Sequence, residues 1–321
     1  PDWSRGLGDV YKRQLLRGAP VAGRRPRGTA RVPNRSFPVS SRRPWGCRIR
    51  SRAVITFRTF ASGSSGNASL LELDRTDGGV DRYLFDAGIS PRRLTNCLAE
   101  LDLGWGDLAG VLPSHFDRDH VHLNMPKTLT AHQVPTILER GQQKEAGQVG
   151  IHGSLMRFHE GILDLSSETQ LKTVRVPHDE HVCCAFVIEH RDLKFALATD
   201  LGSTPKAFLD LAAGADLLAI ESNHCPDLLA SSGRPAFLID RIAGSHGHLS
   251  NHQCVEAVQA ISTNRSPNAI VLLHLSAECN HPHAIENLWR EHLPHLMPNL
   301  HVALRNETTG PFRPGREASL F

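Results

Sequence analysis

The sequence predicts an α/β fold of the α+β kind, in which two β-sheets pack together and helices cover their outer faces. From Ile55 onward, strand-like and helix-like segments alternate without an internal repeat or a long linker. Hairpin signals are frequent in the first half of the chain, whereas helices separate the strands of the second half. With 321 residues, 40% hydrophobic and 21% charged, the chain has the composition of a globular protein with a buried core. The polar residues at the strand ends should then meet along one edge of the sheets.

The first half opens with a predicted β-hairpin, because apolar and polar side chains alternate on both sides of a Gly/Ser/Asn turn. The strands expected in this half cover residues 54–60, 69–73, 83–85 and 108–112. Ser90 is expected to cap a helix, since apolar residues follow it at helical spacing, at Leu94, Leu98 and Leu101. Residues 121–160 are less regular, and we expect only mixed helix and loop there.

The second half alternates strands with helices. Strands are expected over residues 171–176, 184–189, 194–198, 217–220, 269–273 and 300–304. Helices are expected over residues 204–212, 226–241, 250–262 and 282–292. The longest apolar runs are strand-sized and far shorter than the roughly 20 residues that a membrane-spanning helix needs. We therefore expect no transmembrane segment and no membrane partner.

The N-terminal segment differs in charge from the rest of the chain. Residues 1–50 hold 13 Lys and Arg against 2 Asp and Glu, a balance of +11, so the remaining residues, with 23 basic and 31 acidic, carry −8. The segment is rich in Arg, Pro, Gly and Ser and has no helical or strand period, so we expect residues 1–51 to be a disordered basic tail.

Three explanations of this tail remain open. It could bind nucleic acid through its arginines, or it could be an Arg-rich targeting leader. It could also be non-native, because Pro1 stands where an initiator Met is usual and the opening PDWSRGLGDVYKRQ resembles translated sequencing-adapter sequence. We favour the last explanation and expect residues 52–321 to form the folded domain.

The cysteines and histidines indicate which metal chemistry is available. The seven cysteines are an odd number and include no Cys-x-x-Cys pair, which argues against a disulfide framework and against a cysteine-based zinc site. A reducing, cytoplasmic location is the simplest expectation. The 19 histidines are the more frequent metal-competent residues.

A dense cluster of such residues follows the predicted strand at 108–112. The segment Ser-His-Phe-Asp-Arg-Asp-His places His115, Asp117, Asp119 and His120 within six residues. A tight loop can point alternate side chains the same way, so the first two could share one ion while the last two reach a second. Imidazole nitrogens and carboxylate oxygens suit Zn²⁺ and other divalent first-row metals.

Three later strand ends offer further ligands. They are His178 in Val-Pro-His-Asp, Asp200 in Ala-Thr-Asp-Leu-Gly and His274 in Leu-Leu-His-Leu-Ser. Each follows an apolar, strand-like run, as a ligand delivered to a common edge should. Although a lone His at a strand end is usually structural, the presence of three candidates beside the dense cluster favours a metal site.

These motifs resemble a known family. The pattern His115-x-Asp117-x-Asp119-His120, followed by His178, Asp200 and His274, resembles the signature of the metallo-β-lactamase superfamily, with Asp117 where the usual pattern has histidine. The resemblance narrows to the WalJ/YycJ-type branch, whose members are regarded as nucleases, and it spans about residues 56–303. The further matching motifs are Ser62-Gly-Ser-Ser-Gly-Asn67, Phe85-Asp-Ala-Gly88, Glu221-Ser-Asn-His224, Gly247-His-Leu-Ser-Asn251 and His274-Leu-Ser276.

The resemblance implies a four-layer αβ/βα metallo-β-lactamase sandwich with two divalent metal ions at one edge. It implies one ion held by His115, Asp117 and His178, a second held by Asp119, His120 and His274, and Asp200 as the bridge. Two such ions, roughly 3.5–4 Å apart, would lower the pKa of a bridging water to give the attacking hydroxide. Asp119 would be catalytic as well as a ligand. Asp86 would orient a ligating histidine.

The same resemblance leaves the metal open between zinc and manganese, with iron a further candidate. The carboxylate of Asp117 makes its site harder and more anionic than a histidine would, which could favour Mn²⁺ or Fe²⁺ over Zn²⁺.

His248 is a candidate general acid. It precedes Ser250, which with Gln253 forms a Ser-x-x-Gln capping box at the start of a predicted helix. The N–H groups at that helix start could contact a phosphate, and His248 could protonate a leaving oxygen. The alternative is that this segment only caps a helix.

Two further groups are candidates for substrate binding. Ser64, Ser65 and Asn67 could face a substrate phosphate, although the neighbouring glycines already explain the segment as a plain turn. Asn223 and His224 follow a predicted strand beside the expected site and could line it. The alternative for His224 is a buried structural histidine.

The resulting expectation is a metal-dependent hydrolase, more specifically a phosphodiesterase or exonuclease acting on DNA or RNA. Because the body of the chain is acidic, nucleic-acid binding needs a local basic patch, for which Arg92, Arg93 and Arg241 are candidates. The sequence gives no indication of an oligomeric state.

Two alternatives remain. The same metals could hydrolyse a small ester, thioester or lactone, which an apolar, enclosed pocket would favour. A protein that only binds nucleic acid through its tail is the third hypothesis. It predicts that deleting residues 1–51 abolishes binding and that metal removal changes nothing.

Overall fold

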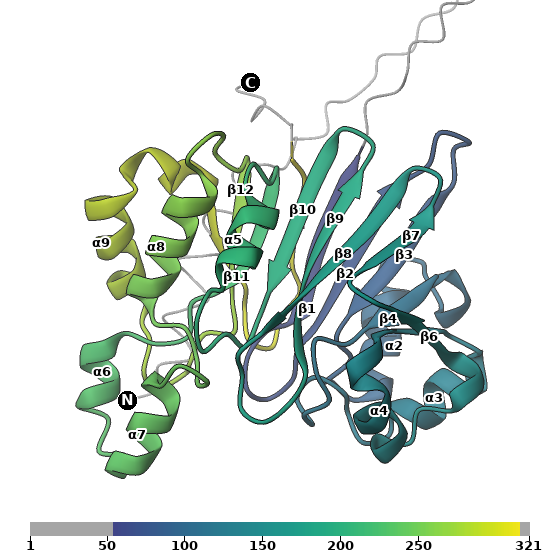
Figure 1. Cartoon of the computed structure of the whole chain (residues 1–321), viewed down its shortest axis with the longest axis horizontal. Helices are drawn as coiled ribbons and strands as arrows, with labels where there is room; N and C mark the ends of the chain where they lie inside the picture. Colours follow the sequence, from purple (N-terminus) through teal and green to yellow (C-terminus); the bar gives the residue numbers. More distant parts are fainter. Residues whose placement is uncertain (1–53, 315–321) are drawn as a thin grey trace, which may run out of the picture. The chain divides into compact units, whose positions relative to one another are not determined.

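The computed structural model describes residues 54–314, which belong to one compact unit of the chain (Figure 1). The expected basic tail over residues 1–51 lies outside the described residues. Within the described range, every helix is too short or too polar to cross a bilayer.

The first sheet has seven strands in the order β14-β1-β2-β3-β4-β5-β6. The strands from β14 to β3 pair in antiparallel fashion, and those from β3 to β6 pair in parallel. Their bounds are Ile55–Ala61 (β1), Ala68–Asp74 (β2), Val80–Phe85 (β3), Gly110–Leu112 (β4), Thr136–Glu139 (β5), Met156–His159 (β6) and Thr309–Phe312 (β14).

The second sheet also has seven strands, in the order β13-β12-β11-β10-β9-β8-β7. The antiparallel part runs from β7 to β10, and the parallel part runs from β10 to β13. Their bounds are Ile162–Ser166 (β7), Thr169–Val176 (β8), Cys183–His190 (β9), Leu193–Ala198 (β10), Leu217–Glu221 (β11), Ala269–Leu273 (β12) and Leu300–Val302 (β13).

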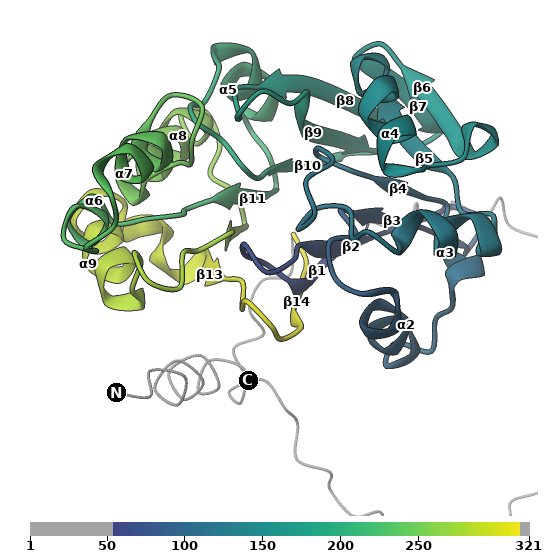
Figure 2. The same ribbon diagram turned by 90° about the horizontal axis from the view of Figure 1, so that it is seen from below.

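Alternate side chains of the strands belong to different layers. On β2, Leu71 joins the core between the two sheets, whereas Leu70 joins the core between the first sheet and its helices. This follows from the two-residue period of a strand, and it explains why strands such as β1 are buried on both faces. Figures 1 and 2 show helices on the outer side of each sheet, which confirms the predicted four-layer sandwich.

The helices divide between the two sheets. Those beside the first sheet are α2 (Pro91–Ala99), α3 (Met125–His132) and α4 (Gln143–Val149). Those beside the second sheet are α5 (Lys206–Ala212), α6 (Pro226–Ala230), α7 (Ala236–Ala243), α8 (Asn251–Ile261) and α9 (Pro282–His292). Short 3₁₀ turns lie at Trp105–Asp107, Arg140–Gln142, Gly153–Leu155 and Pro294–Asn299. Phe208 of α5 and Trp289 of α9 are fully buried and anchor this outer layer.

The structure differs from the sequence-based expectation in three places. Residues 121–160 contain two strands, β5 and β6, besides helices, and neither β7 nor β14 was expected. The helix expected over residues 226–241 is broken into α6 and α7. Gly233 takes a left-handed φ of 70°, and Pro235 disfavours a helical conformation in the residue before it.

Three residues at the ends of strands turn the chain sharply. Asp86 follows β3, Asp200 follows β10 and His274 follows β12, with φ values of 57°, 54° and 54°. Asp and His tolerate this left-handed conformation better than most residues, although it still costs roughly 1–2 kcal/mol. All three side chains point into one buried cluster, so the local strain positions the site.

Candidate metal centre

The loop of residues 115–120 follows β4 and is held by the turn after β3. The backbone N–H of Ala87 donates to the carbonyl of His120 at 2.7 Å. A Cβ atom on Gly88 would lie 1.7 Å from the carbonyl oxygen of Asp119. Only glycine therefore fits at this point, which explains the Phe-Asp-Ala-Gly motif.

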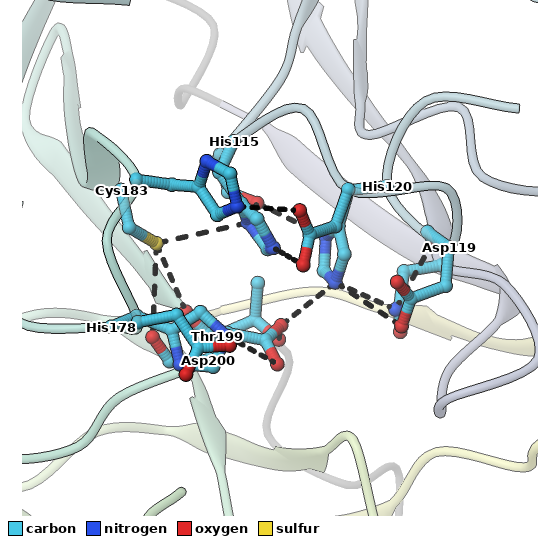
Figure 3. A network of polar contacts seen from close by, with 12 residues as sticks. His115, Asp119, His120, His178, Cys183, Thr199 and Asp200 are labelled. Carbon is cyan, nitrogen blue, oxygen red and sulfur yellow. Dashed lines mark hydrogen bonds and ion pairs between the residues drawn. The ribbon is translucent and has the colours of Figure 1, made fainter. Parts of the chain in front are cut away.

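The structure brings the seven predicted metal ligands together. One donor atom from each residue lies within 4.8 Å of the others in two groups, which are His115, Asp117 and His178, and Asp119, His120 and His274. Asp200 lies between the groups, as Figure 3 shows. Its Oδ2 is 2.8 Å from Nε2 of His120, and its Oδ1 is 3.8 Å from Nε2 of His178. These side chains therefore lie together as predicted, and their division between two ions stays a prediction.

The histidines are oriented by contacts on their far sides. Nδ1 of His120 lies 2.9 Å from Oδ2 of Asp86, and Nδ1 of His178 lies 2.9 Å from the carbonyl oxygen of Gly247. Asp86 is itself fixed, since it accepts the backbone N–H of Ser114 at 2.7 Å. With Nδ1 engaged, Nε2 of each ring faces the centre. Asp86 therefore takes the orienting position predicted for it.

Glu221 is a functional residue that the sequence analysis missed. It is fully buried, and its Oε1 lies 2.8 Å from Nδ1 of His248 and 2.9 Å from Nδ1 of His274. Its Oε2 accepts the backbone N–H groups of Leu201 and Leu249 at 2.7 and 3.1 Å. A buried carboxylate is costly unless it is paired in this way. The available signal was a charged residue ending the otherwise apolar strand β11.

His181 is a second missed residue. Its Nε2 lies 3.1 Å from Oδ1 of Asp117, and its Nδ1 lies 3.6 Å from Oε1 of Glu145. It stands three residues after His178, on the loop before β9. Asp117, which stands where the pattern that the sequence resembles has histidine, thus contacts a histidine from another loop.

The electrostatics of the centre favour positive charge. Burial, the largest single influence, lowers the pKa of both His120 and His274, but the neighbouring carboxylates together outweigh it. Asp200 and Asp86 together raise the pKa of His120 well above its usual value. Asp200, Asp119 and Glu221 together raise the pKa of His274 to about 10. A cluster that attracts protons this strongly is also suited to divalent cations.

The environment of one buried nitrogen, Nε2 of His274, fits a bound cation. Nε2 of His274 is buried, has no hydrogen-bond partner within residues 54–314, and lies 3.7 Å from Oδ2 of Asp119. Buried polar atoms are rarely left unpaired. First-row divalent ions bind imidazole nitrogen and carboxylate oxygen at roughly 2.0–2.2 Å, so donors this close together fit a shared ion. The residues present are consistent with a dinuclear metal site.

Comparison with known proteins agrees with this geometry. The beta-lactamase superfamily domain matches residues 81–275, a range that includes all seven predicted ligands. The chain belongs to the metallo-β-lactamase superfamily.

Two bacterial relatives in this superfamily carry nuclease names. Exodeoxyribonuclease WalJ of Streptococcus pneumoniae is 30% identical over 230 residues, which cover 70% of this chain and 82% of that protein. Exodeoxyribonuclease YycJ of Bacillus anthracis is 24% identical over 227 residues, covering 70% and 83%. The crystal structure of the metallo-beta-lactamase fold protein YhfI from Bacillus subtilis superimposes with a TM-score of 0.57 at 14% identity, covering 79% of this chain and 99% of that one. This structural likeness confirms the fold.

His248 lies at the edge of the metal centre. Its Nδ1 is 3.3 Å from Oδ1 of Asp200, in addition to its contact with Glu221. The predicted capping box is present, because Ser250 Oγ accepts the N–H of Gln253 and the Gln253 side chain accepts the N–H of Ser250. The segment therefore caps α8 and also presents a histidine to the site.

The hairpin turn between β1 and β2 places its three candidates differently. Ser64 and Ser65 are exposed. Asn67 is buried, accepts the backbone N–H of Gly63 at 2.8 Å and donates to the carbonyl of Asp119 at 3.3 Å. Asn67 thus fastens the metal-binding loop, and the contact of all three with substrate stays a prediction.

The two candidates after β11 also differ. Asn223 is buried, donates to the carbonyl oxygen of His274 at 2.8 Å and lines the pocket beside the metal centre. His224 is almost fully buried, its Nδ1 has no hydrogen-bond partner among the residues that the structure describes, and burial lowers its pKa to about 4. This environment is that of a neutral buried histidine, and a substrate contact of either residue stays a prediction.

Proposed function

We propose that the protein is a dinuclear metal-dependent phosphodiesterase that acts as an exonuclease on nucleic acid, with DNA as the first candidate. The observation that carries this proposal is the pair of ligand groups joined by Asp200, with buried Glu221 and its partner His248 beside them. The names of the two bacterial relatives support a nucleic-acid substrate.

In this proposal, seven side chains bind the two metal ions. His115, Asp117 and His178 would hold one ion, Asp119, His120 and His274 the other, and Asp200 would bridge them. When bound, the two ions would supply Lewis-acid activation of the scissile phosphate and of the attacking water. Zinc and manganese are the candidate metals, with iron a third, and the carboxylate of Asp117 favours the harder ions.

Asp119 and His248 carry the proton transfers in this proposal. Asp119 orients the attacking water and accepts its proton as the water oxygen bonds to phosphorus. His248 donates a proton from Nε2 to the leaving oxygen as the phosphorus–oxygen bond breaks. Glu221 holds Nδ1 of His248, which leaves Nε2 as the nitrogen free for this transfer.

A cleavage assay tests the proposal. The full chain is incubated with end-labelled single-stranded DNA and RNA in Mn²⁺, Zn²⁺ or chelator. We expect metal-dependent release of labelled product, and a loss of at least about a hundredfold in the Asp119→Ala variant. Asp210→Ala, an exposed change on α5, is the matched control and should cleave normally.

The assay also separates the alternative function. If the metal-loaded protein leaves both polymers intact but hydrolyses small esters, thioesters or lactones, the nuclease proposal is wrong and the alternative substrate class holds. If chelator leaves cleavage unchanged, the metal-dependent mechanism is wrong.

A further inference from the structure

A pocket of about 220 Å³ adjoins the metal centre on the side of α6 and α7. His248 and His274 line it, so the pocket is continuous with the proposed catalytic site. Leu238 and Ile242 of α7 contribute an apolar wall, and Ser64 of the hairpin turn also borders it. Figure 1 shows α6 and α7 below α8 and α9, and Figure 2 shows the same group on the side away from α2, α3 and α4.

An exposed aromatic side chain stands next to this pocket on α7. Phe237 is 74% exposed, the largest exposure among the large apolar side chains of residues 54–314. It immediately precedes Leu238, and Arg241, which lines the pocket, is four residues further on. Residues four apart on a helix are neighbours, so Phe237 lies beside the pocket-lining face. No core packing accounts for this ring.

Arginines supply positive charge on both sides of the pocket. Arg234 and Arg241 line it. On the hairpin side, Nη2 of Arg305 donates to Oγ of Ser64 at 2.9 Å, and its Nε is buried without a hydrogen-bond partner in the part of the chain that the structure describes. Arg234 and Arg241 thus lie in the pocket wall and Arg305 beside it, and Leu229, Leu238 and Ile242 give the wall an apolar part.

Arg234 and Arg241 each form an ion pair with an acidic side chain, but these pairs are weak. Arg234 pairs with Glu278 at 2.7 Å, and Arg241 pairs with Asp179. One member of each pair is exposed, since the side chains of Glu278 and Arg241 are 75% and 63% exposed, whereas those of Arg234 and Asp179 are 26% and 22% exposed. Ion pairs at exposed positions contribute little free energy. A phosphate group can therefore compete for both arginines.

The shape and chemistry of the pocket fit one ligand class. At about 220 Å³ the pocket is smaller than the roughly 300–1,000 Å³ of pockets for drug-sized ligands, so its size limits it to part of one nucleotide and excludes a duplex. An apolar wall suits a base or sugar, guanidinium groups suit phosphates, and an exposed aromatic ring suits an unpaired base. A single strand with a free end combines all three.

We propose that this pocket, the α7 pocket, binds the terminal nucleotide of a single DNA strand, with Phe237 stacking on the neighbouring base. The proposal rests on the proposed function and adds the substrate's strandedness and the unit of cleavage. Arg241 and Arg234 hold the phosphates that follow the terminal nucleotide. Because the pocket accepts no more than one nucleotide beside the metal centre, the products are mononucleotides.

Steady-state kinetics on a single-stranded oligodeoxythymidylate test the stacking part. Phe237→Ala is expected to raise KM about tenfold and to lower kcat by much less, because a base–aromatic stack is lost. Phe237→Trp, which keeps a stacking surface, should restore KM. Ile162→Ala is the matched control, since Ile162 is 61% exposed on the distant edge strand β7. Metal content measured on each variant shows whether the centre is intact.

The salt dependence of kcat/KM tests the arginines. Each phosphate contact on a single strand contributes about 0.7 to the slope of log(kcat/KM) against log salt concentration. Arg241→Ala should therefore flatten the slope by about 0.7. Arg290→Ala, which removes an exposed arginine paired with Glu286 on α9, should leave the slope unchanged.

The outcomes separate the two proposals. Cleavage by the unsubstituted protein, with KM and salt slope in Phe237→Ala and Arg241→Ala equal to those of the two controls, overturns the α7 pocket while the proposed function stands. Oligonucleotide products longer than one residue also overturn it. Absence of any metal-dependent cleavage overturns both proposals.

Discussion

Two buried carboxylates, Asp86 and Glu221, orient histidines of the metal centre through contacts with Nδ1 of the rings. Asp86 contacts Nδ1 of His120, and Glu221 contacts Nδ1 of both His248 and His274. Burial would raise the pKa of Glu221, but the neighbouring histidines, His248 foremost, lower it to about 2. Glu221 therefore carries a full negative charge that links the proposed general acid to a proposed ligand.

Replacement of Glu221 by Gln should disturb both histidines without changing the volume of the side chain. We expect metal affinity to fall by about 10- to 100-fold, because carboxylates behind metal-bound histidines contribute that much. Metal content after dialysis, together with kcat, measures the effect. Glu256→Gln, an exposed change on α8, is the control, and equal metal content in the two variants would contradict the role assigned to Glu221.

Asp117, which stands where the resembled pattern has histidine, should affect which metal ion the protein prefers. Asp117→His substitutes a softer nitrogen donor for a carboxylate, so retention of Zn²⁺ should rise relative to Mn²⁺. The measurement is the Zn to Mn ratio bound after equal loading, by elemental analysis. His181→Ala is a useful companion, because His181 contacts Asp117 and its loss leaves the donor set unchanged. An unchanged ratio in Asp117→His would show that this position does not select the metal.

Short motifs in the sequence indicated which side chains the structure brings together, whereas residues placed by contacts between distant segments were not predicted. The ligands and Asp86 lie in recognisable short segments that follow strands. Glu221 and His181 gain their roles only when β11, β12 and the loop before β9 meet in space. The sequence predicted either a substrate contact or a plain turn for Asn67. Its hydrogen bonds to Gly63 and Asp119 show that it also holds the metal-binding loop in place, which neither interpretation included.

At the level of elements, the turn after β3 and the metal-binding loop after β4 are packed backbone against backbone. Gly88 makes this contact possible, because any Cβ there would strike the carbonyl of Asp119. The φ of Gly88 is not in the left-handed region, so the requirement is one of space. This backbone contact therefore fixes the positions of Asp119 and His120 in the loop.

Gly88→Ala should therefore lower both stability and metal content. We expect a loss of about 3 kcal/mol in the free energy of unfolding, as for overpacked sites. Gly147→Ala is the matched control with the opposite sign. Gly147 lies in α4 with open space around its Cβ position, and the change should stabilise the protein by up to about 1 kcal/mol. Denaturant titrations measure both, and a tolerated Gly88→Ala would refute the packing argument.

The elements that the sequence predicted are those with an unbroken pattern. The strands of the second sheet from β9 to β12 are mostly apolar and β8 alternates apolar and polar residues, so the positions of all five were predicted closely. β5 and β6 have only four residues each and each follows a short helix or 3₁₀ turn, which leaves too little pattern to detect. The break between α6 and α7 was missed although Gly233 and Pro235 signal it.

For the whole molecule, the metal centre joins the two halves of the sandwich. The 115–120 loop follows β4 of the first sheet, whereas Asp200 and His274 follow β10 and β12 of the second. The sequence predicted this convergence because each ligand follows a strand. The α7 pocket could not be predicted, because it depends on the helix break that brings Arg234 beside Leu238 and on the approach of the hairpin turn to α7.

Because ions would join the two sheets, metal removal should destabilise the whole fold. A ligand present at 100 times its Kd stabilises a protein by about 2.7 kcal/mol, and a domain of this size shifts Tm by roughly 2–4 °C per kcal/mol. Each ion should then raise Tm by about 5–10 °C.

Thermal unfolding of the full chain with chelator, and after readdition of Mn²⁺ or Zn²⁺, measures this shift. Asp119→Ala should lose part of it, because one of the two ligand groups is then incomplete. Asp210→Ala should retain all of it. A Tm that chelator leaves unchanged would mean that no ion joins the sheets, and the donors grouped around Asp200 would then need another source of compensation for their buried charge.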